Sequence, residues 1–221
     1  MLKYNTVIWD MDGTVLNTLD DLHTAMNHVL SVNSYPRITK DESRRYVGNG
    51  IRNYVKRALP KDSSDEVIDK IFAEMNAYYK NHCEIKTAPY PGILEIMQSL
   101  NDLNVSQAIV SNKPDAAVKI LTEKYFPGLI TVSIGENEAE GIRKKPNPDE
   151  VIIALKELGK TKEDAVFIGD SEVDFKTAVN SGLPSVSVLW GFRTIEELKN
   201  AGAGLFINKP AEILDIVKGN K

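Results

Sequence analysis

The segment Thr6-Val7-Ile8-Trp9-Asp10-Met11-Asp12-Gly13-Thr14 decides the fold of this chain, because a strand and a chemically active turn meet in it. Residues 6–9 are apolar or β-branched and predict a short strand. Two carboxylates, Asp10 and Asp12, follow this strand with one residue between them. Gly13 then permits a tight backbone turn.

Further apolar segments appear only after residue 105, and each precedes a helical or turn-rich stretch. They are Gln107 to Val110, Ile130 to Ile134, Ala165 to Ile168 and Ser185 to Leu189. Alternation of short strands with helices is typical of a parallel α/β sheet. The pattern predicts an α/β fold with a Rossmann-like, doubly wound parallel sheet.

The long interval between the first strand and these segments has helical periodicity instead. Apolar residues of the segment Leu19 to Val32 fall on one helical stripe, and a second helix is predicted near Ser63, which has capping-box spacing to Glu66. Pro89-Tyr90-Pro91-Gly92 interrupts this pattern. We therefore expect a helical cap domain, 16–86, inserted into a core made of 1–15 and 87–221.

The amino-acid composition argues against nucleic acids and membranes as binding partners. The 221 residues are 42% hydrophobic and carry a formal net charge of -4, which gives no overall electrostatic footprint for nucleic acid. The single cysteine, Cys83, cannot form an intrachain disulfide, and no apolar run reaches the length of a membrane span. We expect a cytoplasmic protein without a nucleic-acid or membrane partner. The sequence does not predict the oligomeric state.

Polar residues follow the predicted strands at their carboxyl ends, where ligands bind in open α/β sheets. The segments concerned are Asp10 to Thr14, Ser111-Asn112-Lys113, Lys145-Pro146 and Gly169 to Asp174. Together they supply several carboxylates, a hydroxyl and an ammonium group. These groups suit phosphoryl transfer, in which a carboxylate can be the nucleophile and a hard cation such as Mg²⁺ can offset the clustered negative charge.

The four motifs DMDGT, SNK, KP and GDSEVD, in this order, resemble those of the haloacid dehalogenase-like phosphatase superfamily. The resemblance covers almost the whole chain and implies a Rossmann-like core with a helical cap. It implies that Asp10 is the nucleophile and that Asp12 is the general acid and base. It also implies that Mg²⁺ is held by the Asp10 side chain, the Asp12 backbone carbonyl and Asp170, with Asp174 orienting a metal-bound water.

The same resemblance assigns the phosphoryl group to residues of the second and third motifs. Ser111, Asn112 and Lys145 would bind its oxygens, and the lysine would also offset the charge of Asp10. Within the superfamily, Asp12 argues against dehalogenases and phosphonoacetaldehyde hydrolases, which lack this second aspartate. The resemblance thus implies a phosphatase that acts through an aspartyl-phosphate intermediate.

The substrate is expected to be a small phosphorylated metabolite. Val47-Gly48-Asn49-Gly50 and Trp190-Gly191-Phe192-Arg193 look like segments of phosphoglycolate phosphatases, and Asn49, Gly50 and Arg52 are candidates for substrate specificity. Inorganic pyrophosphatase and β-phosphoglucomutase-like activity remain alternatives. A nucleotide-sugar glycosyltransferase, which would use Asp-x-Asp as a metal site, and a non-catalytic binding protein are weaker ones.

Overall fold

The computed structural model describes residues 2–220, apart from the side chain of Glu138. The chain divides into two compact units, which we name the core unit (Met1–Leu16 and Pro89–Lys221) and the helical unit (Asn17–Ala88). It passes between them at β2 (Leu16–Asn17) and β3 (Ala88–Pro89), two strands that pair in a small sheet of their own. The role of the helical unit as a cap is a proposal.

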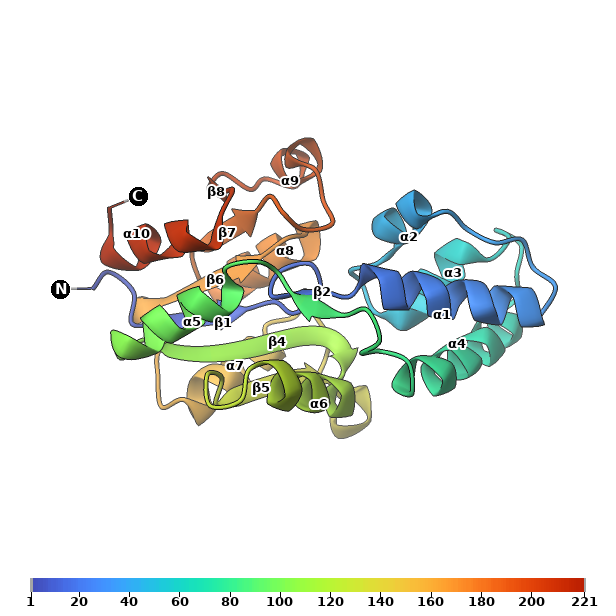
Figure 1. The fold of residues 1–221 in the computed structure, drawn as a ribbon, viewed down its shortest axis with the longest axis horizontal. Coiled ribbons are helices and arrows are strands. Elements are labelled where there is room, and N and C mark those ends of the chain that lie inside the picture. Colours follow the sequence, from blue (N-terminus) through green and yellow to red (C-terminus); the bar gives the residue numbers. More distant parts are fainter. Residues whose placement is uncertain (1, 221) are drawn as a thin grey trace. The chain divides into compact units, whose positions relative to one another are not determined.

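A parallel sheet of six strands, in the order β5-β4-β1-β6-β7-β8, organises the core unit (Figure 1). Its strands are β1 (Thr6–Trp9), β4 (Ser106–Pro114), β5 (Val132–Glu136), β6 (Ala165–Gly169), β7 (Ser185–Val188) and β8 (Phe206–Ile207). After β1 the sheet grows toward β4 and β5 on one side, and from β6 onward it grows on the other. The point where the strand order reverses, beside β1, is where such sheets bind ligands.

Helices cover both faces of this sheet, which explains why its central strands are continuously apolar. The core-unit helices are α5 (Ile93–Asp102), α6 (Asp115–Tyr125), α7 (Asp149–Glu157), α8 (Glu172–Ser181), α9 (Ile195–Asn200) and α10 (Ile213–Lys218). Ile8 and Phe167 pack with residues of α7 and α8 on one face. On the α5 side, Trp9 donates to Gln107, whose amide donates to the Met97 carbonyl. The predicted fold class is confirmed.

The predicted strands are found, with some differences in extent. β1 covers the predicted residues 6–9, whereas β4 continues to Pro114 and so contains Ser111, Asn112 and Lys113, which were expected to follow it. The two-residue strand β8 was not predicted, because so short a segment has no periodicity of its own.

The helical unit contains α1 (Leu19–Val32), α2 (Lys40–Tyr46), α3 (Ile51–Ala58) and α4 (Asp65–Lys80). Helix α1 has the predicted bounds. The predicted cap of α4 was wrong by one residue: the N-cap is Ser64, whose hydroxyl accepts from the Val67 amide, and not Ser63. Extended backbone dihedrals at Ser64 place its oxygen over the first turn.

Asp21 ties the start of the helical unit to its end. Its buried carboxylate accepts hydrogen bonds from the Lys86 amide and from both the amide and the hydroxyl of Thr87.

None of the helices in the described part of the chain combines the length and the apolar character that a membrane span requires.

Candidate active site

Three buried aspartates meet at the carboxyl edge of the core sheet. Asp10 follows β1, Asp170 follows β6, and Asp174 lies in the first turn of α8. One carboxylate oxygen of each lies within 4.8 Å of the other two. Since β1 and β6 are paired neighbours with Trp9 opposite Ile168, the residues after them necessarily emerge side by side.

Lys145 places its ammonium group between two of these carboxylates. Nζ donates to Oδ1 of Asp10 at 2.5 Å and to Oδ1 of Asp174 at 2.7 Å, and the Val110 carbonyl lies 3.3 Å away. An ammonium has three N–H donors, so these partners use all of them. Lys145 is 2% exposed, and its Nζ lies 5.7 Å from the centre of the Phe167 ring. The lysine therefore fixes the orientation of the Asp10 carboxylate.

Asp174 is committed to the protein through both of its oxygens. Oδ1 accepts from Lys145, and Oδ2 accepts from the amides of Asp170 and Ser171 and from the Ser171 hydroxyl. The Ser171 hydroxyl accepts in turn from the Asp174 amide, which makes a capping box at the start of α8. Asp174 thus orients Lys145 and the turn that carries Asp170.

Glycine residues leave room for the carboxylate of Asp170. A Cβ atom built on Gly13 or on Gly191 would collide with the Asp170 side chain, and Gly13 has a φ of +89° that favours glycine. The Phe192 amide donates to Asp170 Oδ2 at 2.5 Å. Two glycine-containing loops, one after β1 and one after β7, thus hold Asp170 at the centre of the site.

Burial makes the negative charge of this cluster costly. It raises the pKa of Asp10 to about 7, with a further contribution from the Asp174 carboxylate, although Lys145 opposes the shift. Burial likewise raises the pKa of Asp170 well above 3.8. Buried carboxylates that share one ammonium form an all-oxygen donor set suited to a hard divalent cation. The residues present therefore fit the predicted metal.

Asp12 has a lysine of its own. Nζ of Lys113 lies 3.1 Å from Oδ1 of Asp12, and the lysine is almost completely buried whereas the Asp12 side chain is 17% exposed. The remaining predicted phosphate ligands lie nearby on β4: the Ser111 hydroxyl accepts from the Lys113 amide, and the Asn112 side chain donates to the Lys145 carbonyl. Lys113 was quoted as part of a motif but was not predicted as a site residue.

Two further residues of the core unit approach the site without having been predicted there. Burial raises the pKa of Tyr90, and the Asp170 and Asp12 carboxylates add to this effect. Arg193 is 6% exposed and donates from Nε to Glu172 at 2.8 Å. The motif Trp190 to Arg193 could have indicated Arg193, but no sequence signal places Tyr90 beside the aspartates.

The predicted specificity residues lie in the helical unit, around the start of α3. Gly50 is the N-cap of α3 with a φ of 77°, and the Asn49 carbonyl accepts from the Asn53 side chain. Arg52 is held by two ion pairs, from Nε to Asp69 at 2.7 Å and from Nη2 to Asp65 at 3.3 Å. A substrate anion would have to compete with these carboxylates for Arg52.

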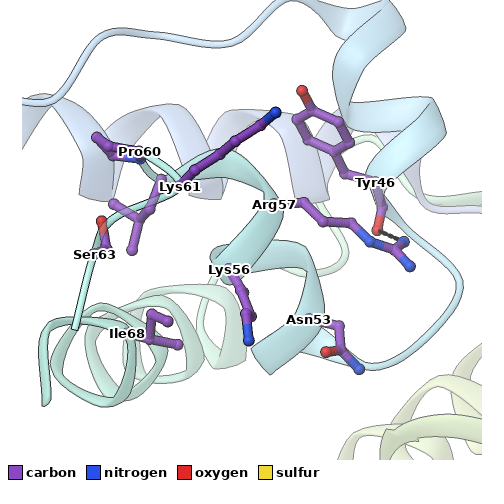
Figure 2. A pocket seen from close by; sticks show the side chains of 9 residues that line it. Tyr46, Asn53, Lys56, Arg57, Pro60, Lys61, Ser63 and Ile68 are labelled. Atoms are coloured by element: carbon purple, nitrogen blue, oxygen red, sulfur yellow. Dashed lines mark hydrogen bonds between the residues drawn. The ribbon is translucent and has the colours of Figure 1, made fainter. Parts of the chain in front are cut away.

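A pocket of about 670 Å³ lies within the helical unit (Figure 2). Its lining residues are Tyr46, Asn53, Lys56, Arg57, Leu59, Pro60, Lys61, Ser63 and Ile68. In Figure 2 the Lys61 side chain extends toward Tyr46 whereas Lys56 points elsewhere, and Arg57 already donates to the Tyr46 carbonyl at 2.8 Å. The three cations do not converge on one point, so the pocket is basic without being a defined anion site.

Comparison with known proteins decides the family. A sequence model of haloacid dehalogenase-like hydrolases matches residues 7–188, most of the chain. The chain belongs to this family.

Similar members of the family are phosphatases. This hydrolase is 31% identical over 191 residues to a phosphoglycolate phosphatase of Rhodobacter capsulatus, covering 85% of each chain. An N-acetylmuramic acid 6-phosphate phosphatase of Pseudomonas aeruginosa is 24% identical, and the match covers 98% of this chain and 96% of that protein. The crystal structure of a protein from Lactobacillus delbrueckii, which is named as a predicted phosphoglycolate phosphatase, matches with a TM-score of 0.93 at 33% identity. The match covers 98% of this chain and 99% of that chain.

These findings confirm the predicted family, with its likeness to phosphoglycolate phosphatases, and the predicted enzyme class, a phosphatase of small phosphorylated substrates. They favour a phosphatase over the glycosyltransferase and the non-catalytic binding protein. Phosphatases of this family generally use a divalent metal, in agreement with the buried aspartate cluster.

Glu150, the second residue of α7, is a buried carboxylate that the sequence did not reveal. It is 0% exposed, and neither oxygen accepts a hydrogen bond from any residue that the structure describes. Burial raises its pKa from 4.5 to about 8, with Lys145 opposing and Asp10 among the carboxylates that add to the shift. An uncharged Glu150 avoids adding another buried negative charge near Asp10 and Asp174.

This shift predicts how Glu150→Gln changes stability with pH. The folded protein keeps the Glu150 proton up to about pH 8, whereas the unfolded chain loses it near pH 4.5. The folded state then binds more protons between these values, so the free energy of unfolding falls as pH rises through this window. A glutamine side chain at this position cannot ionise, so the stability of Glu150→Gln relative to the wild type should be greater at pH 8 than at pH 5.

Denaturant unfolding at several pH values between 5 and 8 measures this difference. The matched control is Glu157→Gln, a change of an exposed glutamate in the same helix, for which we expect a difference that does not vary with pH. The same difference for Glu150→Gln at both ends of the range would show that Glu150 is ionised in the folded protein.

Proposed function

We propose that this hydrolase is a Mg²⁺-dependent phosphatase that cleaves a small phosphorylated metabolite through an aspartyl phosphate on Asp10. The observation that carries the proposal is the ammonium of Lys145 between Asp10 and Asp174, beside Asp170. A carboxylate held by a lysine at the ligand-binding edge of the sheet is oriented for attack and cannot rotate freely.

The chemistry consists of two displacements at phosphorus. An oxygen of Asp10 bonds to phosphorus while the bond to the leaving oxygen breaks, and that oxygen takes the electron pair and a proton from Asp12. A water oxygen then bonds to the same phosphorus and gives a proton to Asp12 as the bond to Asp10 breaks. Phosphate leaves, and both aspartates return to their starting states.

The residues proposed to hold Mg²⁺ are Asp10, Asp170 and the backbone carbonyl of Asp12. The bound ion would offset the charge of the carboxylates and of the phosphate oxygens that approach them. Asp174 supports these residues through the turn at Ser171 and through Lys145. Ser111, Asn112 and Lys145 remain the proposed ligands of the phosphoryl group, with Lys145 exchanging one of its present partners for a phosphate oxygen.

Phosphoglycolate is the substrate we propose, because the Rhodobacter relative, which is 31% identical, carries this activity in its name. The helical unit, expected as a cap over 16–86, would supply the contacts that distinguish substrates, with Asn49, Gly50 and Arg52 as candidates. Since Arg52 is ion-paired to Asp65 and Asp69, release of one pair would accompany any contact with a substrate carboxylate.

Asp10→Asn tests the nucleophile. Asparagine keeps the shape of the side chain but is a poor nucleophile, so kcat should fall by about 10³-fold or more, the scale seen when other enzymes lose their nucleophile. Phosphate release under steady-state conditions measures this, with Asp102→Asn, a change of an exposed aspartate at the end of α5, as the control that should retain full activity. Full activity of Asp10→Asn would remove Asp10 from the mechanism.

Asp170→Asn tests the metal. A cation that binds only the folded protein raises its Tm, so Mg²⁺ added after chelation should raise the Tm of the wild type and restore its activity. Asp170→Asn should show a much smaller Tm shift over the same range of Mg²⁺ concentrations. Hydrolysis by the wild type that persists in excess chelator would contradict the proposed cofactor.

A substrate panel tests the specificity. The purified protein with Mg²⁺ is assayed against phosphoglycolate, pyrophosphate, β-glucose 1-phosphate and nucleoside monophosphates, and we expect the highest kcat/KM for phosphoglycolate. Preference for pyrophosphate would instead indicate an inorganic pyrophosphatase. Isomerisation of the sugar phosphate without release of phosphate would indicate β-phosphoglucomutase-like activity.

A further inference from the structure

Lys113 is a buried cation that the proposed mechanism leaves without a task. It lies near the end of β4 and is 3% exposed, so its ammonium needs a compensating charge within the protein. Its ion-pair partner is Oδ1 of Asp12, at 3.1 Å. Lys145 donates to Asp10, Asp174 and the Val110 carbonyl.

The backbone around Lys113 is held on several sides. β1 ends at Trp9 opposite Ile109, whereas β4 runs on to Pro114, so Lys113 lies beside the loop that carries Asp12. The pairing of β4 with β5 is irregular after Ser111, and the Lys113 amide donates to the Ser111 hydroxyl. A Cβ atom on Gly135 would collide with the Lys113 carbonyl, so β5 packs closely against this segment. A lysine anchored in this way can define where a partner carboxylate lies.

Resting on the proposed function, we infer that Lys113 is a positioning residue that holds the Asp12 side chain in place for both displacements. The Asp12 side chain must reach the leaving oxygen in the first displacement and the attacking water in the second. The ion pair with the ammonium fixes the position of the Asp12 side chain, and Lys113 forms no bond to the substrate. Loss of Lys113 should therefore impair every step in which Asp12 transfers a proton, and no other step.

This role makes the effect of Lys113→Met depend on the leaving group. The value of kcat/KM reports only the steps up to the first displacement. p-Nitrophenolate leaves without a proton, so kcat/KM for p-nitrophenyl phosphate should change by less than about threefold. The leaving group of an alkyl phosphate needs a proton, so its kcat/KM should fall by about 10²-fold, in the range of general acid catalysis. The second displacement is common to both substrates and should slow. Rapid mixing with p-nitrophenyl phosphate should then give a burst of p-nitrophenolate stoichiometric with enzyme.

The experiment uses the whole protein with Mg²⁺, with p-nitrophenyl phosphate and the alkyl phosphate turned over fastest in the panel above. Methionine fills the space of the lysine stem, and thermal unfolding checks that the variant is folded. Lys119→Met removes the cation of an exposed ion pair with Asp115 on α6 and should leave both kcat/KM values unchanged. In the Asp12→Asn background, Lys113→Met should cause no further loss, because Lys113 acts through Asp12.

Equal losses of kcat/KM for the two substrates, without a burst, would overturn the inference and make Lys113 a ligand of the phosphoryl group. A further loss in the Asp12→Asn background would overturn it as well. Failure of the proposed function looks different, since the wild type itself would then release phosphate from neither substrate.

Discussion

The contact of Lys145 with Asp10 and Asp174 is the interaction on which the rest of the site depends. Three aspartates at the same edge of the sheet would repel one another if all were charged and buried. One ammonium joins the loop before α7 to the end of β1 and the start of α8, so three distant parts of the chain share one electrostatic constraint. The cost of burying the lysine is met only when both carboxylates are in place.

Two buried lysines contact different carboxylates of the site. Lys145 orients the proposed nucleophile, and Lys113 lies against the proposed acid and base, Asp12. Asp170 is held differently, by the Phe192 amide and by space that Gly13 and Gly191 leave open. Each carboxylate that the mechanism uses thus has its own support.

Much of the fold could be predicted because strands buried on both faces are apolar throughout and helices repeat with a fixed period. The strand 6–9 and the helix from Leu19 to Val32 have their predicted bounds. The cap at Ser63 was misplaced because Ser64 offers the same hydroxyl one residue later, and only backbone dihedrals choose between them. Strand β8 was missed because two residues are too few to show a pattern.

The sequence by itself determined the order of the strands β1, β4, β5, β6 and β7 along the chain, the chemistry available at their ends and the family, because the motif residues adjoin apolar segments. The tertiary structure alone decided which charged groups meet. It pairs Lys113 with Asp12 and Arg52 with Asp65 and Asp69, and it leaves Glu150 without a hydrogen-bond partner among the described residues. Such contacts depend on how elements pack, and local spacing along the chain carries no information about them.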